Sequence, residues 1–251
     1  MNSLLAAFRF LTVFPVPGRR GTGPADLAGS VPYFPLVGLL LGGLGAGLAV
    51  GLSYVAPPLL AAALLVVAFV AFSGGLHMDG LSDTADGFLG SRVRERTLEI
   101  MKDSHVGAMG VLGIACVVLV KWAALASVPG RDLWRVALLT PLAGRAVMVL
   151  HLATLPYARP AGLGAIFYCR RHRADAAWAV LVLLLTGGLV LGVRGVAVGV
   201  ASVAVALGMA VVCSRRIGGV TGDTLGAVCE ITETVPAVVL AAWEQVMTKL
   251  Q

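Results

Sequence analysis

Charge is what this sequence has least of. Only 13% of its 251 residues are Asp, Glu, Lys or Arg, about half the share found in ordinary soluble domains. Hydrophobic residues make up 58%, the mean hydropathy is +0.92, and no charged side chain occurs from Leu27 to Leu76. This composition excludes a disordered chain and argues against a soluble globule, so we expect a membrane protein.

Cysteine motifs are also missing, and no leader peptide is expected. The four cysteines form neither a CxxC pair nor a Cys/His spacing, which argues against a zinc site or a disulfide framework. No basic start precedes a short apolar core at the N-terminus, so no cleavable signal is predicted. The net charge of +6 would suit nucleic acid, but the basic residues cluster between apolar segments, as is typical of membrane topology. We therefore expect membrane lipids and no nucleic acid as partners.

Six apolar segments are about long enough to cross a bilayer as helices, which takes roughly 20 residues. They are Tyr33–Ala56, Leu59–Leu76, Val106–Val128, Leu133–Leu155, Ala176–Val193 and Gly195–Cys213. Val235–Val246 is shorter and suits either a short span or an interfacial helix. The prediction is an all-α, polytopic transmembrane bundle of about six to seven spans, built as one integral-membrane domain over 1–251. Its 32 glycines permit close helix packing within one chain or between the subunits of a homo-oligomer.

The basic residues indicate the orientation of the bundle. A cytoplasmic N-terminus assigns 13 of the 19 Lys and Arg residues to the inner side, as the positive-inside rule favours. These residues are Arg9, Arg19, Arg20, Arg92, Arg94, Arg96, Lys102, Arg159, Arg170, Arg171, Arg173, Arg215 and Arg216. In this orientation the main acidic clusters of the chain face the cytoplasm.

Three carboxylates follow the long uncharged stretch. Asp79, Asp83 and Asp86 would lie within about 60° of arc on one helical face, where they repel one another. A divalent cation would relieve that repulsion, and Mg²⁺ or Mn²⁺ prefers such hard oxygen ligands. A solvated acidic turn at a helix end is the alternative. The position of the cluster at a membrane edge favours a functional site.

A second acidic set follows the sixth span. Asp223 and Glu230 are seven residues apart and share a helical face, and Glu233 lies one turn further. Two such clusters can hold one or two metal ions, an arrangement used in phosphoryl transfer. The predicted metal ligands are therefore Asp79, Asp83, Asp86, Asp223 and Glu230. A helix cap explains Asp223 equally well.

Charges near and within the third and fourth spans have several explanations. The stretch Arg92–Asp103 is typical of a solvated surface helix, although Lys102 is placed to meet phosphates and Asp103 to meet a metal. Arg145 is expected inside the membrane, where a cation costs at least about 2.5–3.5 kcal/mol, so it should pair with an acid or an anionic ligand. Lys121 is expected to snorkel or to pair internally.

Five motifs occur in order from about residue 9 to residue 233 and together resemble the cobalamin synthase family, the adenosylcobinamide-GDP ribazoletransferases. Most specific is a His-x-Asp-Gly-x-x-Asp-x-x-Asp-Gly pattern followed by Met-Lys-Asp-Ser. Met78 stands at a position that is often acidic in the family. The motifs are Phe-Leu-Thr within Arg9–Phe14, Phe34–Gly38, His77–Gly87, Met101–Ser104 and Gly222–Ala227.

The resemblance implies a Mg²⁺-dependent transferase in the cytoplasmic membrane of a bacterium. It implies that adenosylcobinamide-GDP is joined to α-ribazole or its 5′-phosphate, giving adenosylcobalamin or its phosphate and releasing GMP. Asp83 is a predicted catalytic residue, and either Asp103 or His77 would accept the proton of the attacking hydroxyl. Substrate contacts are predicted for Lys102, Arg145 and Arg9.

Two other functions compete with this one. A CDP-alcohol phosphotransferase acting on a lipid also has an Asp-Gly motif at a membrane edge, but Asp83-Thr84 stands where that family has Ala-Arg. A transporter would use Arg145 and Lys121 at a site in the middle of the membrane. Its acids should lie deep in broken helices, whereas nearly all acids here are predicted in cytoplasmic loops.

Overall fold

The computed structural model describes residues 1–169 and 172–249, apart from the side chain of Leu163. Arg170 and Arg171 of the predicted inner basic set lie outside the described residues. The elements are α1 (Asn2–Leu11), α2 (Pro24–Ala28), η1 (Val31–Tyr33), α3 (Phe34–Val55), α4 (Pro58–Ser73), α5 (Leu76–Gly90), α6 (Arg94–Ile100), α7 (Ala108–Ser127), α8 (Gly130–Thr154), η2 (Leu163–Cys169), α9 (Arg173–Leu191), α10 (Val193–Ile217), α11 (Gly222–Thr232) and α12 (Val235–Lys249). All regular structure in this part of the chain is helical, which confirms the predicted class.

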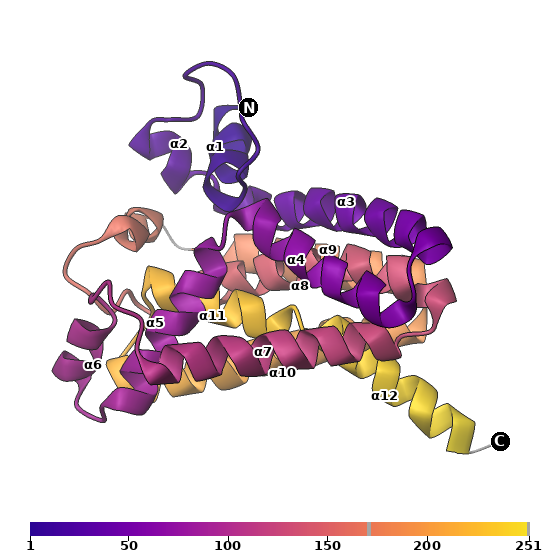
Figure 1. The fold of residues 1–251 in the computed structure, drawn as a ribbon. Helices are drawn as coiled ribbons and strands as arrows, with labels where there is room; N and C mark the ends of the chain where they lie inside the picture. The colour runs from indigo at the N-terminus through magenta and orange to yellow at the C-terminus, as the bar shows by residue number, and fades with distance from the viewer. Residues whose placement is uncertain (170–171, 250–251) are drawn as a thin grey trace.

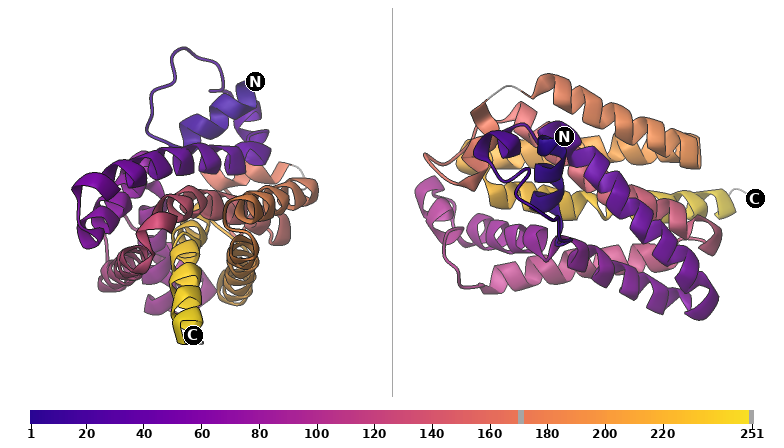
Figure 2. Two further views of the ribbon diagram at one scale, coloured as in Figure 1. Left: turned by 90° about the vertical axis from the view of Figure 1, so that its right-hand side faces the viewer. Right: turned by 90° about the horizontal axis from the view of Figure 1, so that it is seen from above.

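The long helices form one bundle, and α1 and α2 lie across its outside beside the start of α3 (Figures 1 and 2). Within the described residues, six helical segments are long and apolar enough to cross a membrane: Val31–Val55, Ala108–Ser127, Gly130–Thr154, Arg173–Leu191, Val193–Ile217 and Gly222–Lys249. The pair α4 and α5 makes a seventh if it counts as one broken span. The prediction of six to seven spans is confirmed.

Helix α8 is the centre of the bundle. In its most apolar stretch of 18 residues, 83% is buried inside the structure. The corresponding share is at most 67% in the other candidate spans. Helix α3 approaches it closely because Gly38 and Gly42 face the backbone of α8. A Cβ on Gly42 would lie 2.0 Å from the carbonyl oxygen of Leu138. Small residues at the contact allow the two backbones to pack without a hydrophobic driving force from lipid.

The second predicted span, Leu59–Leu76, does not continue straight. Helix α4 ends at Ser73, and Gly74 (φ 63°) and Gly75 (φ 77°) adopt left-handed conformations that glycine allows at little cost. Helix α5 then leaves at an angle of 93°. The bend turns the acidic residues of α5 across the end of the bundle.

The C-terminal segment is longer than Val235–Val246. Helices α11 and α12 together form a candidate span of 28 residues, Gly222–Lys249. Pro236 lies in the first turn of α12, where its missing N–H costs no hydrogen bond. The end of the chain is therefore long enough to cross the membrane.

Ion pairs join the helices at the end of the bundle opposite α5. Asp132 on α8 is fully buried and pairs with Arg135 and, at 3.1 Å, with Arg194 of α10. Arg194 also lies 2.8 Å from Glu244 of α12, which Arg131 contacts at 3.4 Å. Arg131, Arg135 and Arg194 at this end are therefore all paired with neighbouring carboxylates.

The contact between α3 and α8 can be tested with two adjacent glycines. Gly42→Ala would press a methyl group onto the Leu138 carbonyl, and overpacking of this kind costs about 1–3 kcal/mol. We expect its thermal midpoint in detergent to fall by several degrees. Gly43→Ala, with no atom within 4 Å of the added Cβ, should leave the midpoint unchanged or slightly higher. Equal effects of the two variants would contradict the close contact.

Candidate active site

The site begins where α5 crosses α11 at two glycines. A Cβ on Gly80 would lie 2.6 Å from the carbonyl oxygen of Asp223, and one on Gly226 would lie 3.0 Å from that of His77. Because the backbones touch, Asp79 is brought close to Asp223. The start of α11 is fixed locally by a capping box of Thr221 and Thr224. Gly80 and Gly226 belong to the motifs His77–Gly87 and Gly222–Ala227. The spacing within these motifs does not predict that the two helices cross there.

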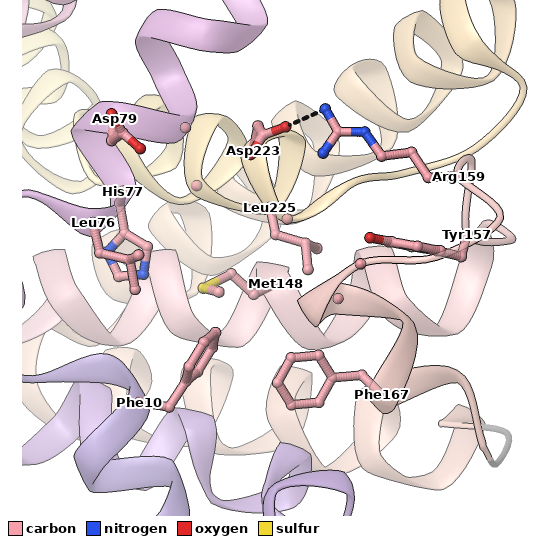
Figure 3. A pocket seen from close by; sticks show the side chains of 15 residues that line it. Phe10, Leu76, His77, Asp79, Met148, Tyr157, Arg159, Phe167, Asp223 and Leu225 are labelled. Atoms are coloured by element: carbon pink, nitrogen blue, oxygen red, sulfur yellow. Dashed lines mark hydrogen bonds and ion pairs between the residues drawn. The ribbon is translucent and has the colours of Figure 1, made fainter. Parts of the chain in front are cut away.

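Asp223 is held by Arg159, for which the sequence predicts only a place on the inner side of the membrane. The N–H of Ala158 donates to the Val220 carbonyl at 2.8 Å, and the N–H of Val220 donates to the Pro156 carbonyl at 2.9 Å. These bonds align the loop after α8 with the loop before α11. Arg159 Nη2 then donates to Asp223 Oδ2 at 2.8 Å (Figure 3). The sequence offers no local signal for a contact across 64 residues.

A cavity of about 310 Å³ lies beside this crossing (Figure 3), and we call it the aromatic cavity. Carboxylates and a guanidinium lie on one side and aromatic and aliphatic groups on the other. Its lining residues are Phe10, Leu76, His77, Asp79, Gly80, Met148, Tyr157, Arg159, Gly162, Gly164, Phe167, Gly222, Asp223, Leu225 and Gly226. Burial raises the pKa of Tyr157 above its ordinary value, so its phenol is protonated at neutral pH and can donate a hydrogen bond.

A second hollow of about 560 Å³, wide open to its surroundings, lies on the side of α5 that faces α7, and we call it the α7-side cavity. It is lined by Gly74, Gly75, Leu76, Met78, Asp79, Ser82, Val106 and Ile114. Leu76 and Asp79 line both cavities. Asp79 therefore borders both, and a group bound in either would lie beside its carboxylate.

The three predicted carboxylates of α5 have different surroundings. Asp86 accepts hydrogen bonds from the backbone N–H groups of Gly107 and Gly110, both at 2.8 Å, and so caps the start of α7. Asp79 and Asp83 have no hydrogen bond or ion pair within the described residues. In that same part of the chain, no three His, Cys, Asp or Glu side chains are gathered to hold a metal by themselves. Two free carboxylates fit a cation that takes its other ligands from substrate phosphates and water.

Glu230 belongs to a buried network of four charges. Lys121 Nζ donates to Glu230 at 2.6 Å and to Glu233 at 2.8 Å, and Arg145 pairs with the other oxygen of Glu233. None of these side chains is more than 3% exposed. Two cations and two carboxylates make the network neutral, which is what a low-dielectric interior requires. Arg145 thus has the acidic partner expected for it, and Lys121 pairs internally.

His77 connects this network to the aromatic cavity. Arg145 Nη2 lies 3.4 Å from His77 Nδ1, and His77 Nε2 has no partner within the described residues. A guanidinium can only donate, so we assign Nδ1 as the acceptor and the proton to Nε2. In this tautomer His77 is a hydrogen-bond donor.

The remaining predicted residues line neither cavity. Lys102 and Asp103 lie in an exposed loop, where hydrogen bonds from His105 hold the pKa of Asp103 below its ordinary value. Arg9 donates to the carbonyl oxygens of Gly18 and Arg20 and so ties down the loop after α1. The structure brings His77, Asp79 and Asp223 to one cavity, while Asp83 is electrostatically coupled to Asp79 and Asp223.

The charge network makes a prediction about stability. Lys121→Met leaves two buried carboxylates with only Arg145 between them, and breaking a buried pair in this way costs about 3–5 kcal/mol. We expect a large fall in the thermal midpoint in lipid nanodiscs. Adding Glu230→Gln restores neutrality and should recover most of the loss. A double variant no more stable than Lys121→Met would contradict the pairing.

Comparison with known proteins gives a consistent result. The sequence model of the family described as cobalamin-5-phosphate synthase matches residues 3–241. The chain is 40% identical over 237 residues to the adenosylcobinamide-GDP ribazoletransferase of Desulforamulus reducens, covering 93% of each chain. Proteins of the same name from Roseiflexus sp. (40% identical; 91% of this chain and 85% of that one) and Pseudomonas putida KT2440 (41%; 90% and 93%) are also similar. No solved structure matches the chain.

Proposed function

Because this chain belongs to the cobalamin-5-phosphate synthase family, we propose that it joins adenosylcobinamide-GDP to α-ribazole or to α-ribazole 5′-phosphate. The product is adenosylcobalamin or its 5′-phosphate, and GMP is released. The observation that carries this proposal is the position of Asp79, which lines both cavities and lies beside other carboxylates. The family match over residues 3–241 supports the same function. The match also decides against the lipid phosphotransferase and the transporter.

The reaction is a phosphoryl transfer. A ribose hydroxyl of α-ribazole attacks the phosphorus that carries the cobinamide, a new P–O bond forms, and the bond from that phosphorus to the bridging oxygen breaks. The bridging oxygen and its electron pair leave with GMP. The sequence predicts Asp103 or His77 as the acceptor of the hydroxyl proton, but Asp103 lies in an exposed loop and His77 Nδ1 faces Arg145. We propose instead that the proton passes to Asp83, the predicted catalytic carboxylate within the acidic cluster.

The cation is proposed to be Mg²⁺, or alternatively Mn²⁺, held by Asp79 and Asp83 with Asp223 beside them. When bound, it neutralises charge on the leaving phosphate. Asp86 and Glu230 accept hydrogen bonds from the start of α7 and from Lys121. Their assignment as ligands stays a prediction.

Cationic and neutral donors around the cavity complete the proposed site. His77 lines the aromatic cavity, and Arg145 positions its ring through Nδ1, which leaves the buried Nε2–H as a donor without a protein partner in the described residues. Arg159 directs a guanidinium at Asp223 from the cavity wall. Lys102, Asp103 and Arg9 line neither cavity, and their assignment as site residues stays a prediction.

The orientation follows from charge. We propose that the end of the bundle carrying α5 and α6 faces the cytoplasm of a bacterium, so that both substrates reach the site from there. The abundance of Lys and Arg predicted on that side supports this orientation, and the three arginines at the opposite end are paired with Asp132 and Glu244.

The acidic cluster can be tested by removing one charge at a time. We expect Asp79→Asn and Asp83→Asn each to lower kcat at least about 100-fold, because transition-state charge would lose its compensation. Glu99→Gln, on the exposed surface of α6 with only a surface ion pair to Arg96, should leave kcat within about twofold. The measurement is GMP release and corrinoid product formation by the protein in lipid.

The requirement for a metal ion is tested in the same assay of GMP release and product formation. EDTA should abolish product formation, and excess Mg²⁺ should restore it in the parent protein and in Glu99→Gln. Full activity in EDTA would overturn the metal assignment while leaving the transferase in place. Full activity of both α5 variants would move the site away from this cluster.

A further inference from the structure

The apolar wall of the aromatic cavity is built around two aromatic rings in contact. The rings of Phe10 and Phe167 lie 5.3 Å apart between centroids and are tilted by 56°. Phe34 supports both rings from behind, at 6.1 Å from Phe10 and 5.8 Å from Phe167, without lining the cavity. Met148 and Leu225 complete this wall (Figure 3). Such a surface offers aromatic faces and methyl groups to a ligand, and no side-chain hydrogen-bonding group.

The size of the cavity limits what can enter it. A volume of about 310 Å³ lies at the small end of the roughly 300–1,000 Å³ found for ligand pockets. It has room for a nucleoside but not for a corrin ring with its side chains. Resting on the proposed function, the candidates are the guanosine of adenosylcobinamide-GDP and the benzimidazole nucleoside, α-ribazole.

The chemistry of the two bases separates these candidates. Guanine has several donors and acceptors along its edges, and each one buried without a partner costs about 1–3 kcal/mol. The base of α-ribazole is a dimethylated benzimidazole, a flat and almost entirely apolar bicycle that stacks well on aromatic rings. A base that lies against Phe10, Phe167, Met148 and Leu225 meets no hydrogen-bonding side chain on that wall, which suits the second base better than the first.

We propose that the aromatic cavity binds α-ribazole, with its benzimidazole against Phe10 and Phe167. Its ribose then lies toward Arg159, Tyr157 and Asp79, and a 5′-phosphate would meet the Arg159 guanidinium. The larger α7-side cavity, which shares Asp79, is left for the diphosphate that carries the corrinoid. The two substrates meet at the carboxylate that lines both cavities.

The test separates the two substrates kinetically. Phe167→Leu removes the aromatic face, so the KM for α-ribazole should rise at least about 10-fold while the KM for adenosylcobinamide-GDP stays within twofold. The matched control is Phe72→Leu, which alters a ring that contacts Phe14 and Phe69, lines neither cavity and should leave both KM values within twofold. If Phe167→Leu does not fold, Phe10→Leu on the peripheral helix α1 should give the same selective increase.

Direct binding distinguishes this inference from the proposed function. Isothermal titration of α-ribazole into the protein in nanodiscs, without the second substrate, should show saturable binding that Phe167→Leu weakens about 10-fold and that GMP does not displace. This result would support the inference even if no transfer were detected, in which case only the proposed function would fail. An active parent protein whose Phe167→Leu variant changed only the KM for adenosylcobinamide-GDP would overturn the inference. Displacement of α-ribazole by GMP would do the same.

Discussion

The backbone contact between α5 and α11 is the constraint on which the rest of the site depends. Glycine at positions 80 and 226 lets the two helices touch, and any larger side chain at Gly80 would meet the Asp223 carbonyl. The contact brings carboxylates from two motifs far apart in the sequence to one end of the bundle. Without it, Asp79 and Asp223 would not line a common cavity.

Charge compensation sets the site apart from the remainder of the membrane interior. Lys121, Arg145, Glu230 and Glu233 neutralise one another, since an unpaired charge there would be costly. Asp79 and Asp83 have no such partner within the described residues. The charged side chains of this network are therefore paired with one another inside the helix packing. The carboxylates of Asp79 and Asp83, near the place where the two cavities meet, are not paired in this way. The network also reaches the site, because Arg145 contacts His77.

The bend between α4 and α5 explains why there are two cavities. Gly74 and Gly75 turn the chain by 93°, so the start of α5 passes between the space beside α8 and the space beside α7. A straight continuation would carry Asp79 along the bundle axis. The geometry suits a reaction in which one substrate is small and flat and the other is large, because each has its own access to the same carboxylate.

The sequence by itself determined the membrane character, the all-α class, most span positions, the shared face of the acids on α5 and the resemblance to the family. These features depend on composition, on the 3.6-residue period and on local motifs, which act over a few residues. Only the tertiary structure decided that Arg159 holds Asp223, that Lys121 engages Glu230 across 109 residues, and that aromatic residues from α1 and η2 line one cavity. Contacts between distant segments depend on how helices pack, and no local pattern in the chain specifies that packing.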